Sequence, residues 1–141
     1  MIKLSKMENL IMVSGKRKAA IAKAVIRPGT GKITINKIPY ENLTNLFHRL
    51  LLKEPLEIAT KVLGKVEYDI SVNITGGGVE GRIDAARLAI AKALLAVTKS
   101  PELRKAMIEY DRNMIVADVR RKEPYKPGDS KARSKRQKSY R

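Results

Sequence analysis

The fold is decided by residues 66–98, which read VEYDISVNITGGGVEGRIDAARLAIAKALLAVT. Apolar and polar residues alternate without a break from residue 66 to residue 75, and this pattern predicts a strand with one buried face and one polar face. Three glycines follow the strand. Apolar residues then recur every three or four positions from Ile83 to Val97, which predicts a helix that ends near Thr98. A half-polar strand followed by a helix is typical of an α+β sheet with helices on one side only.

Segments on either side of this unit carry weaker signals of regular structure. The alternation over residues 19–36 predicts a β-hairpin. Residues 40–63 are predicted to be mostly helical with an interruption at Pro55, because a proline ring breaks the hydrogen-bond ladder of a helix. A shorter helix is expected over residues 101–109, and a last short strand over residues 114–119. We therefore predict an α+β fold whose mixed sheet has about four strands.

The composition excludes several classes of function. The chain has 141 residues, the length of one domain with a tail. It has no Cys and a single His, so disulfide scaffolds, cysteine nucleophiles and zinc fingers are excluded and little is left for acid–base chemistry. Aromatic residues make up 4%, which argues against a protein that stacks single-stranded bases. We expect no cofactor, no metal ion, no membrane contact and no homo-oligomer. The absence of Cys and of a secretory signal predicts a cytoplasmic protein.

The charge of the chain predicts a nucleic-acid partner. The formal net charge is +16, from 30 Lys and Arg against 14 Asp and Glu. A soluble domain rarely carries that much self-repulsion without a polyanion that offsets it. Residues 120–141 hold ten of the cations and only two acidic residues, and they have too few apolar residues to fold alone. We expect the chain to divide into an N-terminal extension (1–11), a globular body (12–119) and an extended basic tail (120–141).

The glycine run contains a pattern that is easily misread. Gly76, Gly78 and Gly81 satisfy the G-x-G-x-x-G pattern of dinucleotide-binding sites. Two features argue against that function: the preceding strand has a polar face, and the acidic residue expected about 20 residues further on falls at Glu102, inside a predicted helix. Free N–H groups of a glycine loop at a helix N-terminus do attract anions, and Arg82 lies in the first turn. We expect the loop either to bind an RNA phosphate or simply to form a tight turn.

Two further basic segments are candidate phosphate contacts. Residues 15–18 (GKRK) are predicted to form a loop just before the first strand, with three adjacent cations that contact phosphates or are merely solvated. Lys and Arg at nearly alternate positions over residues 131–141 predict an arm that reaches roughly 35–40 Å. Such an arm neutralises phosphates independently of sequence. The alternatives are a tail with only non-specific affinity and a localisation signal.

Other charged residues of the body are assigned no catalytic role. We expect the acidic side chains of the long helix to pair with cations of the same helix, namely Asp84 and Glu80 with Arg87 and Lys92. The single histidine, His48, is expected to be a surface or partly buried helix residue.

Four stretches resemble, in order, the ninth protein of the small ribosomal subunit in its archaeal and eukaryotic form. They are residues 14–24 (SGKRKAAIAKA), 29–36 (GTGKITIN), 76–82 with 86–94 (GGGVEGR and ARLAIAKAL), and 137–141 (QKSYR). The resemblance implies a two-layer α/β sandwich like the second domain of the fifth small-subunit protein. It also implies a structural, non-enzymatic protein that binds rRNA in the head of the small subunit, beside other ribosomal proteins. The family's C-terminal arm reaches towards the anticodon stem-loop of the peptidyl-site tRNA.

The resemblance also assigns candidate contacts by position. Those expected at rRNA are Lys16, Arg17, Lys18, Gly76, Gly77, Gly78, Arg82, Arg120, Arg121, Lys122, Lys126, Lys131, Arg133, Lys135 and Arg136. Those expected at tRNA are Lys138, Ser139, Tyr140 and Arg141. The tail departs from the family at two positions. The bacterial form ends Ser-Lys-Arg, whereas Tyr140 is penultimate here, and Arg136 stands where relatives often have an aromatic residue. One cation and one stacking ring are therefore missing.

We interpret the chain as a structural ribosomal protein, and three alternatives remain open. The same basic surfaces would suit a protein cofactor of another ribonucleoprotein, such as one that processes tRNA. The glycine loop would suit a nucleotide-dependent enzyme. The basic arm would permit binding to an anionic membrane, although it lacks the apolar face that adds insertion energy.

Overall fold

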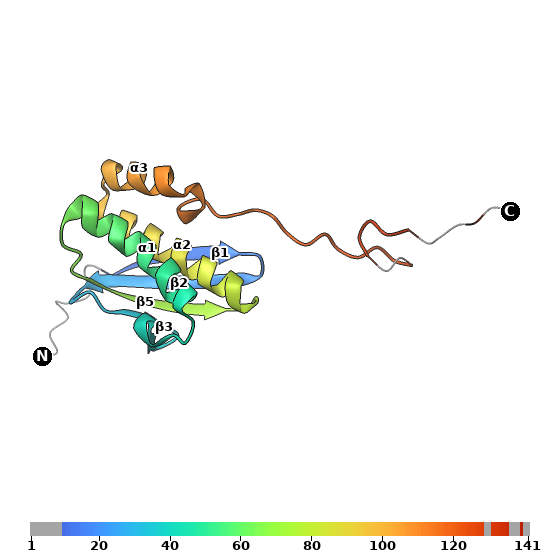
Figure 1. The fold of residues 1–141 in the computed structure, drawn as a ribbon, viewed down its shortest axis with the longest axis horizontal. Helices are drawn as coiled ribbons and strands as arrows, with labels where there is room; N and C mark the ends of the chain where they lie inside the picture. Colours follow the sequence, from blue (N-terminus) through green and yellow to red (C-terminus); the bar gives the residue numbers. More distant parts are fainter. Residues whose placement is uncertain (1–9, 129–130, 136–138, 140–141) are drawn as a thin grey trace, which may run out of the picture.

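The structure is a computed structural model that describes residues 10–128, 131–135 and 139. Within these residues the chain forms a mixed sheet of five strands, in the order β1-β2-β5-β3-β4, with three α-helices on one side of it (Figure 1). This arrangement confirms the predicted α+β fold. The elements are β1 (Ile11–Arg17), β2 (Ala20–Pro28), β3 (Ile33–Ile35), β4 (Ile38–Pro39), the 3-10 turn η1 (Tyr40–Asn42), α1 (Leu46–Leu63), β5 (Tyr68–Thr75), α2 (Val79–Thr98), α3 (Pro101–Tyr110) and the 3-10 turn η2 (Arg112–Met114).

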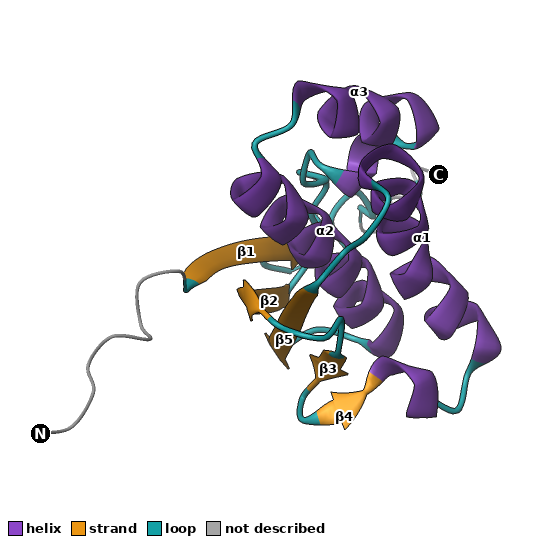
Figure 2. Cartoon of the chain, turned by 90° about the vertical axis from the view of Figure 1, so that its left-hand side faces the viewer, coloured by secondary structure: helices purple, strands orange, loops and turns teal. Residues whose placement is uncertain are grey.

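The strand and the helix predicted from residues 66–98 are confirmed. In β5 the apolar side chains Ile70, Val72 and Ile74 are buried, and the residues between them are more exposed. Helix α2 runs from Val79 to Thr98 and covers the buried face of the sheet (Figure 2). The alternation was reliable because β5 buries only one face, which fixes the period of its apolar residues. The helix was located from its apolar stripe, although α2 is buried on more than one face.

Small residues bring α2 unusually close to the sheet. The buried side chains of β2 include Ala20, Ala22 and Ala24. In β1, a Cβ atom added to Gly15 would lie 2.2 Å from the carbonyl oxygen of Ala85 in α2. Any larger residue at position 15 therefore clashes with helix backbone. The short distance between the two layers explains why alanine and glycine occupy this contact.

The predicted hairpin over residues 19–36 is wrong. Strand β2 pairs antiparallel with β1 on one side and with β5 on the other, where Ala24 lies opposite Val72. Strand β3 instead pairs parallel with β5. Local alternation identifies a strand but does not identify its partner, and the partner of β3 lies far along the chain, with Ile33 opposite Ile70. Strand β1 was missed because its Gly15 and adjacent cations are more typical of a loop.

Two other predicted elements also need correction. Helix α1 begins at Leu46 and passes through Pro55 without interruption, since His48, Leu52, Pro55 and Ala59 form one buried stripe along it. This packing outweighs the hydrogen bond that the proline removes. The predicted strand over residues 114–119 is absent from the described chain, where η2 and extended backbone occupy that region.

Helix α3 starts at Pro101, as predicted. Ser100 is the N-cap of α3, and its Oγ accepts a hydrogen bond of 3.3 Å from the Leu103 N–H. Pro101 occupies the first turn, where a missing N–H costs nothing. Beyond η2 the chain runs away from the body as an extended tail (Figure 1).

No helix among the described residues has the length and apolar character needed to cross a bilayer. The same residues contain no cluster of three His, Cys, Asp or Glu side chains arranged to hold a metal ion.

Candidate nucleic-acid interface

One end of the sheet brings the glycine loop against the β1–β2 turn. The turn consists of Lys18, which has a φ of +50°, and Ala19. Gly76 and Gly77 both have positive φ, and added Cβ atoms would lie 2.7 Å from the Ala19 carbonyl oxygen and 2.8 Å from the Ala20 nitrogen. These glycines are therefore required by a close approach of two backbones. This geometry supports the tight-turn interpretation of the glycine run.

The third glycine has different surroundings. Gly78 is the N-cap of α2, and a Cβ atom added there would meet nothing within 4 Å. The side chain of Arg82 folds back over the loop, where its Nε donates a 2.9 Å hydrogen bond to the Gly76 carbonyl oxygen. Glu80 in the same turn binds His48 Nε2 at 2.9 Å. The loop thus combines an open helix N-terminus with one exposed cation and one carboxylate.

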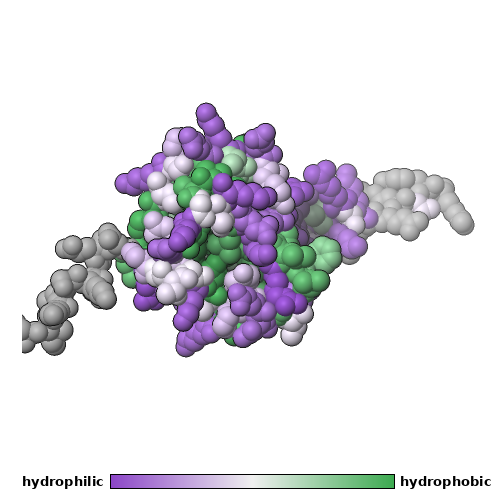
Figure 3. All heavy atoms as spheres, turned by 60° about the vertical axis from the view of Figure 1, so that its left-hand side comes forward, coloured by the Kyte–Doolittle hydropathy of each residue, from purple (hydrophilic) through white to green (hydrophobic). Residues whose placement is uncertain are grey.

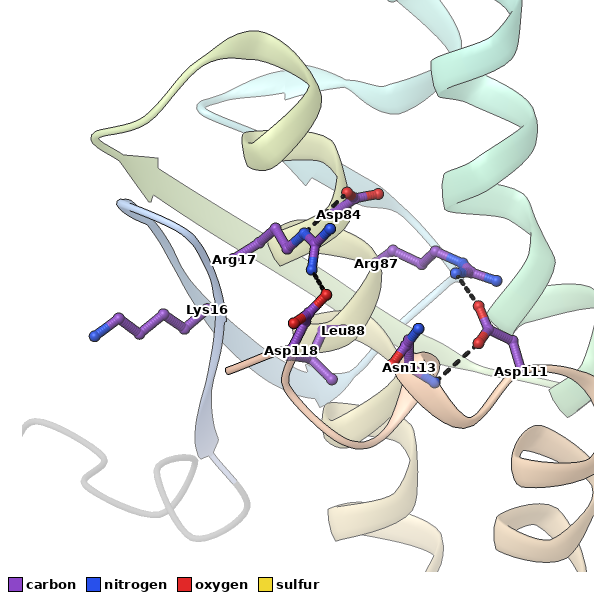
Figure 4. A pocket seen from close by; sticks show the side chains of 8 residues that line it. All are labelled: Lys16, Arg17, Asp84, Arg87, Leu88, Asp111, Asn113 and Asp118. Atoms are coloured by element: carbon purple, nitrogen blue, oxygen red, sulfur yellow. Dashed lines mark hydrogen bonds and ion pairs between the residues drawn. The ribbon is translucent and has the colours of Figure 1, made fainter. Parts of the chain in front are cut away.

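Arg17 is held inside the protein. Its guanidinium forms an ion pair with Asp118 at the start of the tail, and its Nε lies 3.6 Å from Asp84 Oδ2 of α2 (Figure 4). The Arg17 side chain is 22% exposed and that of Asp118 is 11% exposed. Lys16, by contrast, points away from these carboxylates (Figure 4). Of the three cations in residues 16–18, Lys16 and Lys18 are the exposed ones.

The pocket beside Arg17 is lined by carboxylates as well as cations and has a volume of about 200 Å³. Arg87, which lines the pocket, binds Asp111 Oδ2 at 2.7 Å, and it also binds Glu54 of α1 at 2.5 Å. Burial opposes ionisation of Asp111, but hydrogen bonds from Arg87 and from the Asn113 N–H outweigh it, and the pKa of Asp111 is lowered. Ion pairs fill this site, so its arrangement serves to join α1, α2 and the segment after α3.

The expected pairing along α2 is wrong. Asp84 faces Arg17, and Glu80 binds His48. The Lys92 ammonium donates to the Ser14 carbonyl oxygen at 3.4 Å. Each of these partners lies on another element, because α2 is covered on several sides and its charged residues face its neighbours. His48 itself is buried in α1.

A basic groove lies at the root of the tail. It has a volume of about 790 Å³ and is lined by Arg17, Lys18, Ala19, Arg120, Arg121 and Lys122. Asp118 accepts hydrogen bonds from the Arg120 backbone at 2.9 Å and from its guanidinium at 2.6 Å. The Lys122 ammonium lies 4.5 Å from the centre of the Tyr125 ring. Lys18, Arg121 and Lys122 make no ion pair with the described residues. Arg121 donates to the Arg120 carbonyl oxygen at 3.0 Å and Lys122 to the Tyr125 hydroxyl at 3.0 Å, so their positive charges are hydrogen-bonded but not neutralised.

The tail beyond the groove keeps most of its cations exposed. Lys126, Lys131 and Lys135 are exposed, and Arg133 is exposed while its Nε lies 3.0 Å from Glu123 Oε2. In Figure 3 strongly hydrophilic side chains (purple) dominate the part of the tail next to the body. Ser139 is exposed. The remaining candidates of the tail, Arg136, Lys138, Tyr140 and Arg141, lie outside the described residues.

The structure gives two acidic residues a role at this surface that was not predicted from the sequence. Asp118 organises the root of the tail by binding Arg17 and Arg120, and Asp84 supports Arg17 from α2. A single acidic residue two positions before a run of cations was the signal for Asp118. No local pattern signalled its contact with β1.

Comparisons with known proteins agree with this basic, non-catalytic surface. Residues 15–141 match the family described as "Ribosomal protein S9/S16". "Small ribosomal subunit protein uS9" of Picrophilus torridus is 47% identical over 137 residues, which cover 96% of this chain and all of the relative. The uS9 proteins of Methanococcus vannielii and Methanococcus maripaludis are each 43% identical over 129 residues, covering 90% of this chain and 95% of theirs. The chain belongs to the ribosomal protein S9 family, whose members are structural and non-enzymatic.

Proposed function

We propose that this chain is a structural constituent of the small ribosomal subunit and binds the rRNA of the subunit head. The observation that carries the proposal is the basic groove, which gathers the β1–β2 turn and the first cations of the tail at one end of the body. A groove whose free cations come from two separate segments suits a folded polyanion better than it suits a single small anion. Relatives named as small-subunit proteins support the same conclusion.

The glycine loop adds a second element at the same end of the sheet. Gly76 and Gly77 lie against the β1–β2 turn, and the open N-terminus of α2 starts at Gly78. An RNA phosphate bound there gains from the helix dipole and from Arg82. We include the loop in the rRNA-binding surface for this reason.

The tail has the more specific role. We propose that its exposed cations follow rRNA and that Lys138, Ser139, Tyr140 and Arg141 contact the anticodon stem-loop of peptidyl-site tRNA. The support is the direction of the tail, which runs away from the body, together with the resemblance of residues 137–141 to the family's terminus. The protein then works in the cytoplasm, within the ribosome, beside other proteins of the subunit head, with no cofactor and no second copy.

Deletion of residues 137–141 tests the tRNA contact. Small subunits that carry the shortened chain should assemble normally and lose peptidyl-site tRNA faster than wild-type subunits. The matched control replaces Arg104 and Lys105 of α3 with Gln, which removes charge far from the tail and should leave tRNA retention unchanged. Equal tRNA dissociation from shortened and wild-type subunits would contradict the proposal.

Sedimentation of the native protein tests the ribosomal role itself. The protein should travel with particles of the size of small subunits and with whole ribosomes. Recovery in a much smaller ribonucleoprotein would favour the alternative role as a cofactor of an RNA-processing particle.

A further inference from the structure

The face of the sheet opposite the helices carries its own set of polar and cationic side chains. The described helices lie on one side only (Figures 1 and 2), so none of them covers the other side of β1, β2 and β5. Side chains alternate along each strand, and the strand registers place the outward ones in rows. The outward side chains are Met12, Ser14 and Lys16 of β1; Ile21, Lys23, Val25 and Arg27 of β2; and Asp69, Ser71, Asn73 and Thr75 of β5.

The cations of this open face have no acidic partners. Lys16, Lys23 and Arg27 are exposed, and none of them forms an ion pair with the part of the chain that the structure describes. Lys23 lies at the centre, with Ser14 opposite it on β1 and Asn73 opposite it on β5. Uncompensated cations flanked by neutral hydrogen-bonding groups form a surface complementary to a polyanion.

The one carboxylate of this face is already engaged. Asp69 lies opposite Arg27 in the register. Its Oδ1, however, accepts hydrogen bonds from the backbone N–H groups of Thr30 at 2.8 Å and Lys32 at 2.9 Å. Asp69 therefore fixes the loop that follows β2, and although it lies opposite Arg27 in the register, the two side chains form no ion pair.

The side-chain chemistry of the face favours double-stranded over single-stranded RNA. No outward side chain of β1, β2 or β5 is aromatic, so the face has no platform on which unpaired bases would stack. Ser14, Ser71, Asn73 and Thr75 offer hydroxyl and amide groups on a flat surface. The minor groove of an RNA duplex is wide and shallow and presents 2′-hydroxyl groups between two rows of phosphates. Small polar side chains match the hydroxyl groups, and the flanking cations match the phosphates.

We propose that the open face of the sheet, with Lys23 at its centre, docks on the minor groove of an RNA duplex. The inference rests on the proposed function, since it requires that the protein sits on folded RNA. It adds a second binding surface to the basic groove, with Lys16 between the two. The body is then held by RNA at one end and along the whole uncovered face.

A pair of charge-reversed variants of the full chain tests this proposal. One carries Lys23→Glu with Arg27→Glu on the open face, and the control carries Arg104→Glu with Lys105→Glu on exposed positions of α3. Both change the net charge equally. The probes are an RNA duplex of about 20 base pairs and a single-stranded oligouridine of the same length, titrated at several salt concentrations. The open-face variant should lose about tenfold in duplex affinity relative to the control, with a shallower salt dependence, and the two variants should bind oligouridine equally.

The possible results separate the two proposals. Equal duplex affinities for the two variants would overturn the role of the open face while leaving the proposed function intact. Failure of the wild-type chain to bind any RNA would overturn the proposed function, and the open-face proposal with it. Circular dichroism of both variants establishes that each is folded.

Lysine acetylation provides a second readout that needs no variant. In native particles Lys23 should react about tenfold more slowly than in the free protein, because a bound duplex covers it, and ribonuclease treatment should restore its reactivity. Protection of Lys23 that survives ribonuclease would mean that a protein covers the face, and equal reactivity in particle and free protein would mean that nothing does. Either result overturns the proposal.

Discussion

Arg17 and Asp118 are 101 residues apart in the sequence and are joined by an ion pair at the root of the tail. The pair ties the end of β1 to the point where the chain leaves the body. Asp118 also binds Arg120, so one carboxylate orders two cations. The direction in which the tail departs is therefore set by a partly buried contact with the body, which is why the tail starts beside the β1–β2 turn.

Replacement of Asp118 by Asn should destabilise the body. The change leaves Arg17 partly buried without its main counter-charge, and we expect a loss of about 1–2 kcal/mol in the free energy of unfolding. Urea denaturation should show a lower midpoint with an unchanged slope. The control is Glu123→Gln, which removes the exposed partner of Arg133 and should cost less than about 0.5 kcal/mol. Equal midpoints for the two variants would show that the Arg17 pair contributes nothing to stability.

The glycines of the loop should differ sharply in their tolerance of alanine. Gly77→Ala places a Cβ atom 2.8 Å from the Ala20 nitrogen at a positive φ, and we expect a loss of about 2–4 kcal/mol. Gly78→Ala meets open space at an ordinary φ and should cost less than about 1 kcal/mol. Thermal unfolding of both variants measures the difference. If both are well tolerated, the tight-turn explanation of the glycine run is wrong.

Stability should fall in acid partly through Asp111. Because the pKa of Asp111 is below its ordinary value of 3.8, its ion pair with Arg87 stabilises the fold above that pH. This contribution is lost as the pH falls through the lowered pKa of the folded state. Asp111→Asn should therefore be less stable than the wild type at pH 7, and the difference should shrink at pH values below the ordinary pKa. Denaturation curves recorded from pH 7 to pH 3 test this, and a constant difference over that range would contradict it.

Removal of two cations from the basic groove should weaken RNA binding in a salt-dependent way. We expect the double variant Lys18→Gln with Arg121→Gln to lower the slope of log K against log salt by about 1.5–2 for an rRNA fragment, because each phosphate contact releases counterions. Fluorescence anisotropy at several salt concentrations measures the slope. Arg104→Gln with Lys105→Gln on α3 removes the same charge elsewhere. A slope reduced equally by both variants would indicate a general effect of net charge.

The fold was predictable where the apolar residues of an element recur with a regular period. Strand β5 and helix α2 have regular apolar periods, and both were located within two residues of their ends. Strand β1 was missed because Gly15 and the adjacent cations are more typical of a loop. The reason for glycine at this position, its close approach to α2, involves residues far along the chain. The hairpin prediction over residues 19–36 was wrong for a related reason. Alternation in β3 shows that one face of the strand is buried, but its parallel pairing with β5 depends on the path of the chain through α1, which lies between the two strands in the sequence.

Which cations belong to the candidate site was predictable from the sequence. Which contacts and ion pairs they make was less predictable. Charge alone identified Lys18, Arg120 and Arg121 as candidates, and the structure groups them in one groove. The ion pair that occupies Arg17 joins residues with no local relationship, so no spacing pattern in the sequence reports it. The alternation of apolar and polar residues predicted that the sheet has a polar face. Only the strand registers show which side chains are neighbours on that face and that its cations lack ion-pair partners among the described residues.

The close packing of α2 on glycine and alanine residues of the sheet limits how the thermal stability of this protein can be raised. Enlarging a side chain at Gly15, Ala22 or Ala24 would push a helix away from backbone that it already touches, at a cost of about 1–3 kcal/mol. Engineers who want a more heat-resistant variant must therefore work on loops, helix ends and surface charges. The same constraint means that enlarged side chains at this contact should act on folding rather than directly on RNA binding.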